Sequence, residues 1–128
     1  MRVNRLDHLV LTVADLEATV RFYSEILGMR HERFGGGRSA LVFGESKINL
    51  HRVGHEYEPK AHRATAGSAD ICLIVDEPIE SVAAELERNG VALEQGPIRR
   101  TGARGPIISV YVRDPDLNLI ELSSYEEQ

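Results

Sequence analysis

The sequence predicts an α+β domain in which two similar β-α-β-β-β modules share a sheet. The first observation is a repeat: a strand-like segment ending at Val13 returns with its end at Val75, and a helix stopped by Gly28 returns with its stop at Gly90, each 62 positions later. The second observation is that strand-like segments follow each helix. The third is size, because a module of about 60 residues buries too little surface to be secure alone. We therefore expect residues 1–128 to form a single domain of two modules.

The first module, about residues 1–58, begins with an apolar and β-branched segment, Leu6–Val13, in which alternate residues from Leu9 share one face. Asp15 then provides an N-cap, and apolar residues recur at helical spacing until Gly28 ends the helix. Glycine-containing turns separate three strand signals that follow, at Arg30–Phe34, Ser39–Phe43 and Lys47–His51.

A polar connector, about residues 54–68, leads into the second module, about residues 69–128. This module repeats the order, with a strand at Ala69–Val75 followed by a helix whose apolar stripe covers residues 79–86. The segment Pro97–Pro106 is predicted as a loop because of its glycines and prolines. The remaining strands are predicted at Ala92–Gln95, Ile107–Arg113 and Leu119–Ser123.

Composition excludes several classes of function. The chain carries 15 Lys+Arg and 20 Asp+Glu, a formal net charge of −5, without a basic cluster of the kind that binds nucleic-acid phosphates. No apolar stretch approaches the roughly 20 residues of a membrane-spanning helix. The single cysteine, Cys72, cannot form an internal disulfide, and the first strand begins too early for a signal peptide. We therefore expect a cytoplasmic protein whose partners are neither nucleic acids nor membranes.

Strand alternation predicts which side chains face away from the helices, on the open side of the sheet. These are His8 on the first strand, Asn49 and His51 on the fourth, Asp70 on the fifth and Glu121 on the eighth. His8 and Asp70 are equivalent in the repeat, and Asn49 and Glu121 hold matching places in Lys-Ile-Asn-Leu and Leu-Ile-Glu-Leu. A concave sheet would bring these side chains together. One imidazole and two carboxylates suit a divalent metal.

Each of these residues also has an ordinary structural interpretation. His8 alone could be a hydrogen-bonded strand residue, and Asp70 could cap the turn before its strand. Glu121 could lie on a solvated sheet face, and Asn49 and His51 could line a wet cavity. The metal hypothesis therefore depends on the equivalence of the positions in the repeat.

Two arginines and a tyrosine are candidates for substrate binding. Arg100 and Arg104 lie in the predicted loop among glycines, where a guanidinium could bind a substrate carboxylate or phosphate. Tyr111 alternates onto the open side of the following strand. The alternative is that both arginines are solvated loop charges and that Tyr111 is a core or edge residue.

The chain resembles the vicinal oxygen chelate superfamily, which includes glyoxalase I, extradiol dioxygenases, and fosfomycin and bleomycin resistance proteins. The resemblance covers nearly the whole chain. It rests on Leu6-Asp7-His8-Leu9, Asp15-Leu16, the segment from Phe22 to Met29, Asp114-Pro115-Asp116 and Leu119-Ile120-Glu121-Leu122. Asn49-Leu50-His51, Asp70-Ile71-Cys72-Leu73-Ile74 and the segments 58–61 and 100–107 are similar to the subgroup of glyoxalase domain-containing protein 5 and its bacterial relatives.

The resemblance implies paired βαβββ modules that form a cup-shaped, partly open eight-stranded sheet with a divalent metal in the cup. It implies His8, Asp70 and Glu121 as metal ligands, with Asn49 or His51 as a fourth. The family commonly has His where this chain has Asp70, and glyoxalase I has Glu where it has Asn49. The harder donor set favours Mn, Ni, Zn or Mg and disfavours, without excluding, an Fe dioxygenase.

The resemblance further implies glyoxalase-like lyase or isomerase chemistry on a small substrate with two adjacent oxygens, with Glu121 moving the proton. The alternatives are a metal-free protein that binds a drug or metabolite, as in the resistance proteins, or an extradiol dioxygenase. A homodimer is expected from the family, and in some members modules are exchanged between the two chains.

Overall fold

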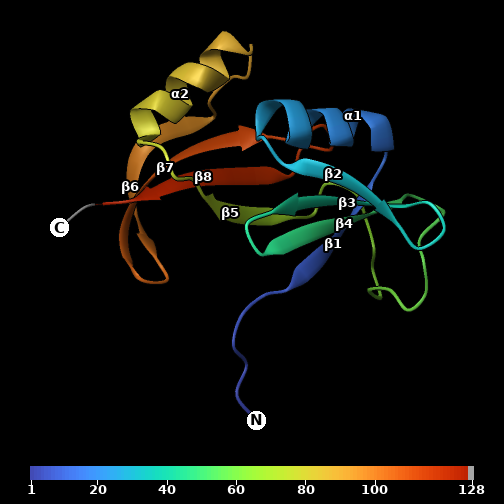
Figure 1. Ribbon diagram of the computed structural model, residues 1–128. Coiled ribbons are helices and arrows are strands. Elements are labelled where there is room, and N and C mark those ends of the chain that lie inside the picture. Colours follow the sequence, from blue (N-terminus) through green and yellow to red (C-terminus); the bar gives the residue numbers. More distant parts are fainter. Residues whose placement is uncertain (127–128) are drawn as a thin grey trace. The chain divides into compact units, whose positions relative to one another are not determined.

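The computed structural model describes residues 1–126, which divide into two compact units, the first Met1–Ser68 and the second from Ala69 onward (Figure 1). The first unit contains β1 (His8–Val13), α1 (Leu16–Arg21), the π-helical turn η1 (Phe22–Ile26), β2 (Arg30–Phe34), β3 (Arg38–Phe43) and β4 (Ser46–Arg52). The second contains β5 (Asp70–Ile74), α2 (Ile79–Arg88), β6 (Gln95–Gly102), β7 (Gly105–Arg113) and β8 (Leu119–Tyr125).

Both units have the same topology. The strands form one four-stranded sheet in each unit, in the orders β1-β4-β3-β2 and β5-β8-β7-β6. The first strand of each unit pairs in parallel with the last, and the other neighbours are antiparallel. The predicted α+β class and the paired βαβββ modules are therefore confirmed.

The predicted helix signals also have the expected geometry. The Asp15 carboxylate accepts the Ala18 N–H at 3.0 Å, which caps α1. Gly28 and Gly90 both adopt a positive φ, at 74° and 73°, so both helices stop at a residue that tolerates the left-handed conformation. The first helix changes from α to π hydrogen bonding at Phe22.

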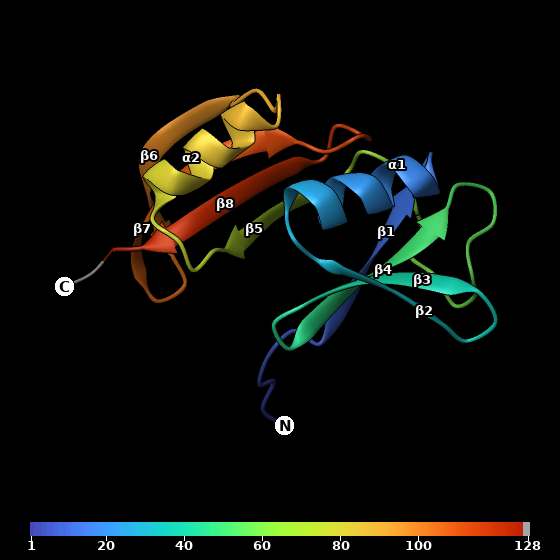
Figure 2. The same ribbon diagram turned by 45° about the horizontal axis from the view of Figure 1, so that its top comes forward.

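Each helix buries one face against its own sheet. On α2, Ile79, Val82 and Leu86 are buried and pack over β6, β7 and β8 (Figure 2). In the first unit, Tyr23 is fully buried, as is Val13 on β1. The opposite face of each sheet is therefore the one available for a site. Among the described residues, neither helix has the length and apolar character needed to cross a membrane.

The largest difference from the predicted elements lies in β6. The strand runs from Gln95 to Gly102, so most of the predicted loop Pro97–Pro106 is strand and the predicted strand at Ala92–Gln95 is wrong. The register between β6 and β7 shifts between Gln95 and Ile98, which marks a β-bulge. Gly96 fits this bulge because a Cβ there would collide with the Ser109 carbonyl oxygen. The Gly-Pro pair therefore marks an irregular strand, not a loop.

Candidate metal and substrate site

The first unit carries three of the predicted site residues on its open face. In the parallel pair β1–β4, Val10 lies opposite Asn49 and Thr12 opposite His51. Side chains alternate along a strand, so His8, Asn49 and His51 all point away from the face that buries Leu11 and Leu50.

His8 is held by its neighbour in the sequence. Its Nδ1 lies 2.8 Å from an Asp7 carboxylate oxygen, and this hydrogen bond lowers the pKa of Asp7 below its ordinary value. In the neutral tautomer that donates its Nδ1 proton to Asp7, Nε2 has a free lone pair. A carboxylate that orients an imidazole in this way is typical of metal-binding histidines. The His8 side chain is 44% exposed, so Nε2 is accessible to a ligand.

Asn49 carries an unusual acceptor. Its Oδ1 is buried and has no hydrogen-bond partner among residues 1–126. Leaving such a group unsatisfied costs about 1–3 kcal/mol. An amide oxygen that is buried without a donor suits a bound cation or a donor group of a ligand.

His51 differs from His8 in its surroundings. It is only 8% exposed, and its ring packs edge-on against Tyr57 with centroids 5.2 Å apart. Burial, helped by the charge of Arg38, lowers the pKa of His51. The imidazole is therefore neutral at pH 7 and could act as a ligand or an acceptor.

In the second unit, two serines hold the Glu121 carboxylate in place. The Ser109 hydroxyl donates to Glu121 Oε2 at 2.6 Å, and Ser123 lies 2.6 Å from the Ser109 hydroxyl. Both serines are fully buried. No donor among residues 1–126 contacts the other carboxylate oxygen, Oε1. Period-two spacing in the sequence places Ser123 on the same face as Glu121, whereas Ser109 reaches Glu121 through the β7–β8 register, in which it lies opposite Ser123.

Asp70 and Cys72 lie on the same face of the second unit. Cys72 is opposite Glu121 in the parallel pair β5–β8, and Asp70 is opposite Leu119. Cys72 Sγ contacts Ser123 Oγ at 3.3 Å. Burial raises the pKa of the Cys72 thiol, so this cysteine is a poor nucleophile.

The candidate substrate-binding residues make two separate contacts, one by Arg100 with Tyr111 and one by Arg104 with Tyr125. Arg100 Nε donates to the Tyr111 hydroxyl at 3.0 Å, and Tyr111 lies directly opposite Glu121 in the sheet. The second unit therefore gathers Arg100, Tyr111 and Glu121 on one face. Arg104 lies in the β6–β7 turn, where its backbone N–H donates to Tyr125 and its guanidinium lies 5.5 Å from that ring. It makes a separate contact.

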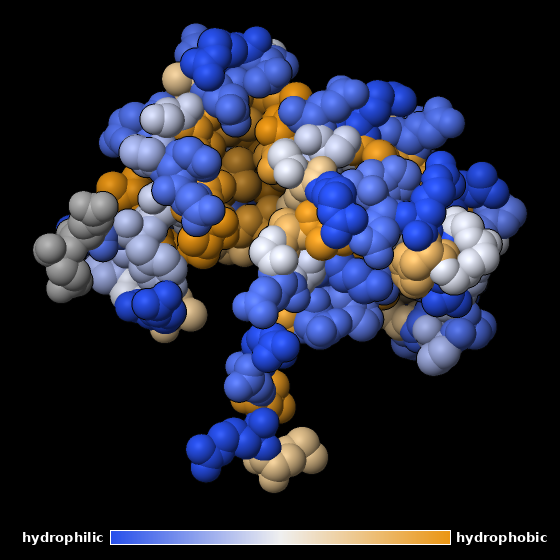
Figure 3. Space-filling model, viewed as in Figure 1, coloured by the Kyte–Doolittle hydropathy of each residue, from blue (hydrophilic) through white to orange (hydrophobic). Residues whose placement is uncertain are grey.

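The open face of the second unit also exposes apolar surface. Ile74, on the face that carries Cys72 and Asp70, is 52% exposed. Figure 3 shows apolar side chains gathered over β5 and β8. A ligand on this face would meet both the Glu121 carboxylate and apolar side chains.

The predicted metal ligands belong to different units, with His8 and Asn49 in the first and Asp70 and Glu121 in the second. Over residues 1–126, neither unit by itself contains three His, Cys, Asp or Glu side chains arranged to hold a metal ion. The donor groups of these residues are one imidazole, two carboxylates and the unpaired amide oxygen of Asn49, a set that suits a hard divalent cation. The metal site itself stays a prediction.

Comparison with known families identifies the class of protein. Residues 5–122 match the model of the Glyoxalase/Bleomycin resistance protein/Dioxygenase superfamily. The chain therefore belongs to this superfamily, which confirms the resemblance inferred from the motifs. Its assignment to the subgroup of glyoxalase domain-containing protein 5 stays a prediction.

Individual relatives cover almost the whole chain. Virulence protein STM3117 of Salmonella typhimurium is 53% identical over 125 residues, covering 98% of this chain and 87% of the relative. Glyoxalase domain-containing protein RDO1 of Mycosarcoma maydis is 50% identical over 127 residues, covering 99% and 72%. An integron cassette protein from the mobile metagenome of V. cholerae has a solved structure with a TM-score of 0.96 at 52% identity, covering 98% of both chains.

More distant relatives carry an enzyme name. The lactoylglutathione lyase of Neisseria meningitidis is 28% identical over 125 residues, covering 91% of this chain and 88% of the relative. The structure of lactoylglutathione lyase from Agrobacterium tumefaciens has a TM-score of 0.75 at 19% identity, covering 97% and 96%, and this likeness shows the fold alone.

Proposed function

We propose that this chain is a metal-dependent enzyme with glyoxalase-like lyase or isomerase chemistry on a small substrate that carries two adjacent oxygens. His8, Asp70 and Glu121 are the metal ligands, and Asn49 or His51 completes the set. The observation that carries the proposal is the buried Asn49 Oδ1, because its cost to the fold is offset when a cation or a ligand donor binds there. The Asp7–His8 hydrogen bond supports it by leaving Nε2 free to bind.

Glu121 is the residue that moves the proton. Ser109 holds Oε2, so Oε1 is the oxygen that would bind the metal and, once released from it, would accept a proton from the carbon next to a substrate carbonyl and return it. A bound divalent metal supplies Lewis acidity to the two substrate oxygens. Because a buried serine holds the carboxylate in place, Oε1 keeps its orientation during the proton transfer and little reorganisation is needed.

Tyr111 and Arg100 bind the substrate on the same face as Glu121. Because the Tyr111 hydroxyl accepts its hydrogen bond from Arg100 Nε, its own proton is available for a substrate oxygen. The remaining guanidinium N–H groups of Arg100 can bind a substrate carboxylate.

The donor set favours Mn, Ni, Zn or Mg over Fe, since it contains a single imidazole and otherwise oxygen ligands. Members of the superfamily are often dimers, and we propose a homodimer here. The ligand assignment is the same whether the metal is held by one chain or by modules of two chains.

The test is the metal content and affinity of the purified full chain, measured by elemental analysis and by calorimetric titration with Mn²⁺, Ni²⁺, Zn²⁺ and Fe²⁺. We expect binding to weaken at least about tenfold in His8→Ala and Glu121→Gln. The matched controls are His62→Ala and Glu85→Gln, which remove the same groups at exposed positions.

Equal and poor metal binding by the wild type and all four variants would overturn the proposal and favour the metal-free binding protein. If binding is confirmed, turnover of the methylglyoxal–glutathione hemithioacetal tests the narrower lyase assignment. Glu121→Gln is then expected to lose more turnover than substrate affinity.

A further inference from the structure

The open face of the second unit has a polar side and an apolar side, and Glu121 lies between them. In the sheet order β5-β8-β7-β6, Glu121 on β8 has Cys72 opposite it on β5 and Tyr111 opposite it on β7. Arg100, on β6, donates its Nε–H to the Tyr111 hydroxyl at 3.0 Å. Ile74 is the next residue of β5 on the same face as Cys72. A ligand lying across these strands over Glu121 would meet polar donors at one end and apolar surface at the other.

The Glu121 carboxylate is held toward the row of residues that contains Ile74. Glu121 Oε2 accepts the Ser109 hydroxyl at 2.6 Å. Ser109 on β7 lies opposite Ser123 on β8, and Ser123 lies opposite Ile74 on β5, so these three residues form one row across the sheet. Both serines are fully buried, whereas Ile74 is 52% exposed. Ile74 is therefore the member of this row that offers apolar surface to a ligand beside Glu121.

Arg100 is the arginine of this face that is free to bind an anion. Arg113 shares the face by alternation, but its guanidinium already donates to both carboxylate oxygens of Glu94, at 2.9 and 2.6 Å. Arg100 forms no ion pair within the described residues 1–126. Its Nη1 lies 3.4 Å from the Arg99 carbonyl oxygen, and its Nη2 has no hydrogen-bond partner in the same part of the chain. A carboxylate is the group that this free edge of the guanidinium binds best.

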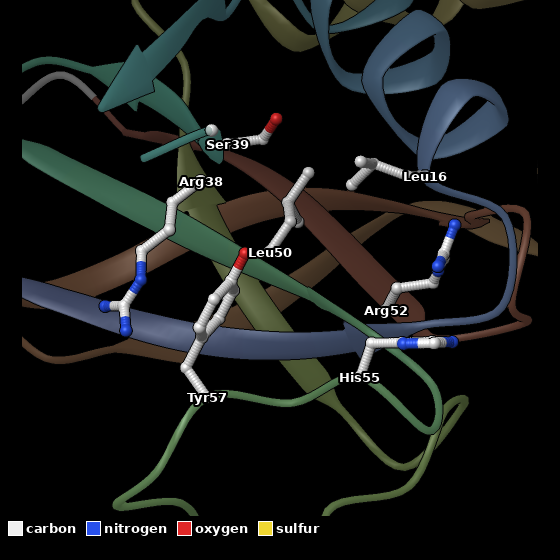
Figure 4. A pocket seen from close by; sticks show the side chains of 8 residues that line it. Leu16, Arg38, Ser39, Leu50, Arg52, His55 and Tyr57 are labelled. Atoms are coloured by element: carbon white, nitrogen blue, oxygen red, sulfur yellow. The ribbon is translucent and has the colours of Figure 1, made fainter. Parts of the chain in front are cut away.

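The pocket of the first unit offers no such arrangement. It has a volume of about 130 Å³, and its lining includes Arg38, Arg52 and Tyr57 (Figure 4). The Arg38 guanidinium stacks on the Tyr57 ring, 4.0 Å from its centroid, and points away from Arg52 across that ring. These two arginines therefore do not converge on one ligand, whereas Arg100 and Tyr111 are joined by a hydrogen bond.

Strand spacing sets the length of a ligand that reaches both sides. Neighbouring strands lie about 4.8 Å apart, so β5 and β7, which are separated by β8, lie about 10 Å apart. A ligand that reaches Tyr111 and Arg100 with one end and Ile74 with the other must span about this distance. A short-chain carboxylic acid that ends in a phenyl ring or a branched alkyl group has this length.

We infer that the substrate is a 2-oxo acid with an apolar substituent, bound at its carboxylate by Arg100 and Tyr111 and at its apolar end by Ile74. Ile74 is then a specificity-determining residue. The inference rests on the proposed function, in which Glu121 removes a proton from the carbon next to a substrate carbonyl. In such an acid this carbon lies between the carbonyl and the apolar group, and the carbonyl and the carboxylate supply two adjacent oxygens.

The test is an amide NMR titration of the ¹⁵N-labelled full chain with 2-oxo-4-phenylbutanoate, with its methyl ester and with pyruvate. Each titration is done at constant ionic strength, once with EDTA and once with Mg²⁺. We expect saturable shifts at amides of residues 72–74, 109–111 and 121–123. The ester lacks the charge and pyruvate lacks the apolar group, so each should bind about tenfold more weakly than 2-oxo-4-phenylbutanoate.

Two variants assign the two ends of the ligand. Arg100→Gln should weaken binding of 2-oxo-4-phenylbutanoate about tenfold and leave binding of its ester unchanged. Ile74→Ser should also weaken it about tenfold and leave binding of pyruvate unchanged. The matched controls are Arg99→Gln, which removes an arginine that pairs with Glu126, and Val53→Ser, which removes an apolar side chain 49% exposed in the first unit.

The inference is overturned if, in both EDTA and Mg²⁺, the ester or pyruvate binds as tightly as 2-oxo-4-phenylbutanoate. It is also overturned if either control variant weakens binding as much as its partner, since the loss would then not depend on this face. Absence of metal binding refutes the proposed metal chemistry separately, because the titrations in EDTA still show whether the acid and apolar ends are recognised.

Discussion

The turn between β7 and β8 allows a quantitative test of what holds the second unit together. Asp114 and Asn118 are 3% and 1% exposed, and their side chains form one network. Asp114 Oδ1 accepts the backbone N–H groups of Asp116 and Asn118, both at 2.9 Å, and Oδ2 accepts Asn118 Nδ2 at 2.8 Å. Asn118 Oδ1 accepts the Ala69 N–H at 2.8 Å, which fixes the start of β5 to the start of β8. The network therefore positions the strands that carry Asp70 and Glu121.

Changing either side chain alone breaks the pairing. In Asp114→Asn, two amide NH₂ groups face each other, and Asn118 cannot rotate because its Oδ1 is needed by Ala69. In Asn118→Asp, two buried carboxylates face each other instead. Each single variant should lose about 2 kcal/mol of unfolding free energy. The double variant exchanges the amide and the carboxylate and restores each of the four hydrogen bonds named above, so it should lie within about 1 kcal/mol of the wild type, a coupling of about 3 kcal/mol.

Urea denaturation of the four proteins measures this coupling, with Asp76→Asn as an exposed control expected to change stability by less than about 0.5 kcal/mol. The reasoning is refuted if the double variant is as unstable as the sum of the single variants, or if neither single variant is destabilised.

Three further predictions follow from local features. Leu117 has a φ of 68° and is 67% exposed, so Leu117→Gly should raise the unfolding free energy by about 0.5–1 kcal/mol; a loss of stability would contradict a strained backbone there. Burial lowers the pKa of His51, so the folded state resists protonation and stability should fall as the pH drops below the usual histidine value of 6.5. Denaturation between about pH 7.5 and 5.5 should show a smaller fall in His51→Gln, and an identical fall would contradict this assignment. Desolvation of its thiol raises the pKa of Cys72, although the residue as a whole is exposed. Mass spectrometry should therefore show that iodoacetamide at about pH 8 alkylates Cys72 more slowly than it alkylates glutathione. Equal rates would argue against a perturbed thiol.

The sequence predicted the parts of the fold that local patterns determine. The Asp15 cap and the two glycine stops depend on local patterns, and the structure contains each of them. The repeat is also present, since β1 and β5 begin 62 positions apart at His8 and Asp70, although β5 ends at Ile74, one residue before the predicted Val75. The faces of β1, β4, β5 and β8 also followed from alternation, because one side of each sheet packs against a helix.

What the sequence could not show depends on register and on irregular backbone. The contact of Ser109 with Glu121 requires knowing how β7 is aligned with β8, and alternation gives the face of a residue but not its partner. The glycine and proline at the bulge are typical of turns, so the sequence predicted a loop where the structure has β6. Tyr57 lies in a polar connector with no periodic pattern, so its stacking with Arg38 and the pocket beside it were not foreseen.

The Mn²⁺ dissociation constant of Asn49→Leu tests the central claim most directly, because the claim rests on the unpaired Asn49 Oδ1. Leucine is close to asparagine in size and removes an acceptor that has no partner, so the metal-free variant should be at least as stable as the wild type. We predict that it binds Mn²⁺ about tenfold more weakly than the wild type while denaturing at no lower urea concentration. A stable variant with unchanged Mn²⁺ affinity would contradict the assignment of Asn49 to a metal site.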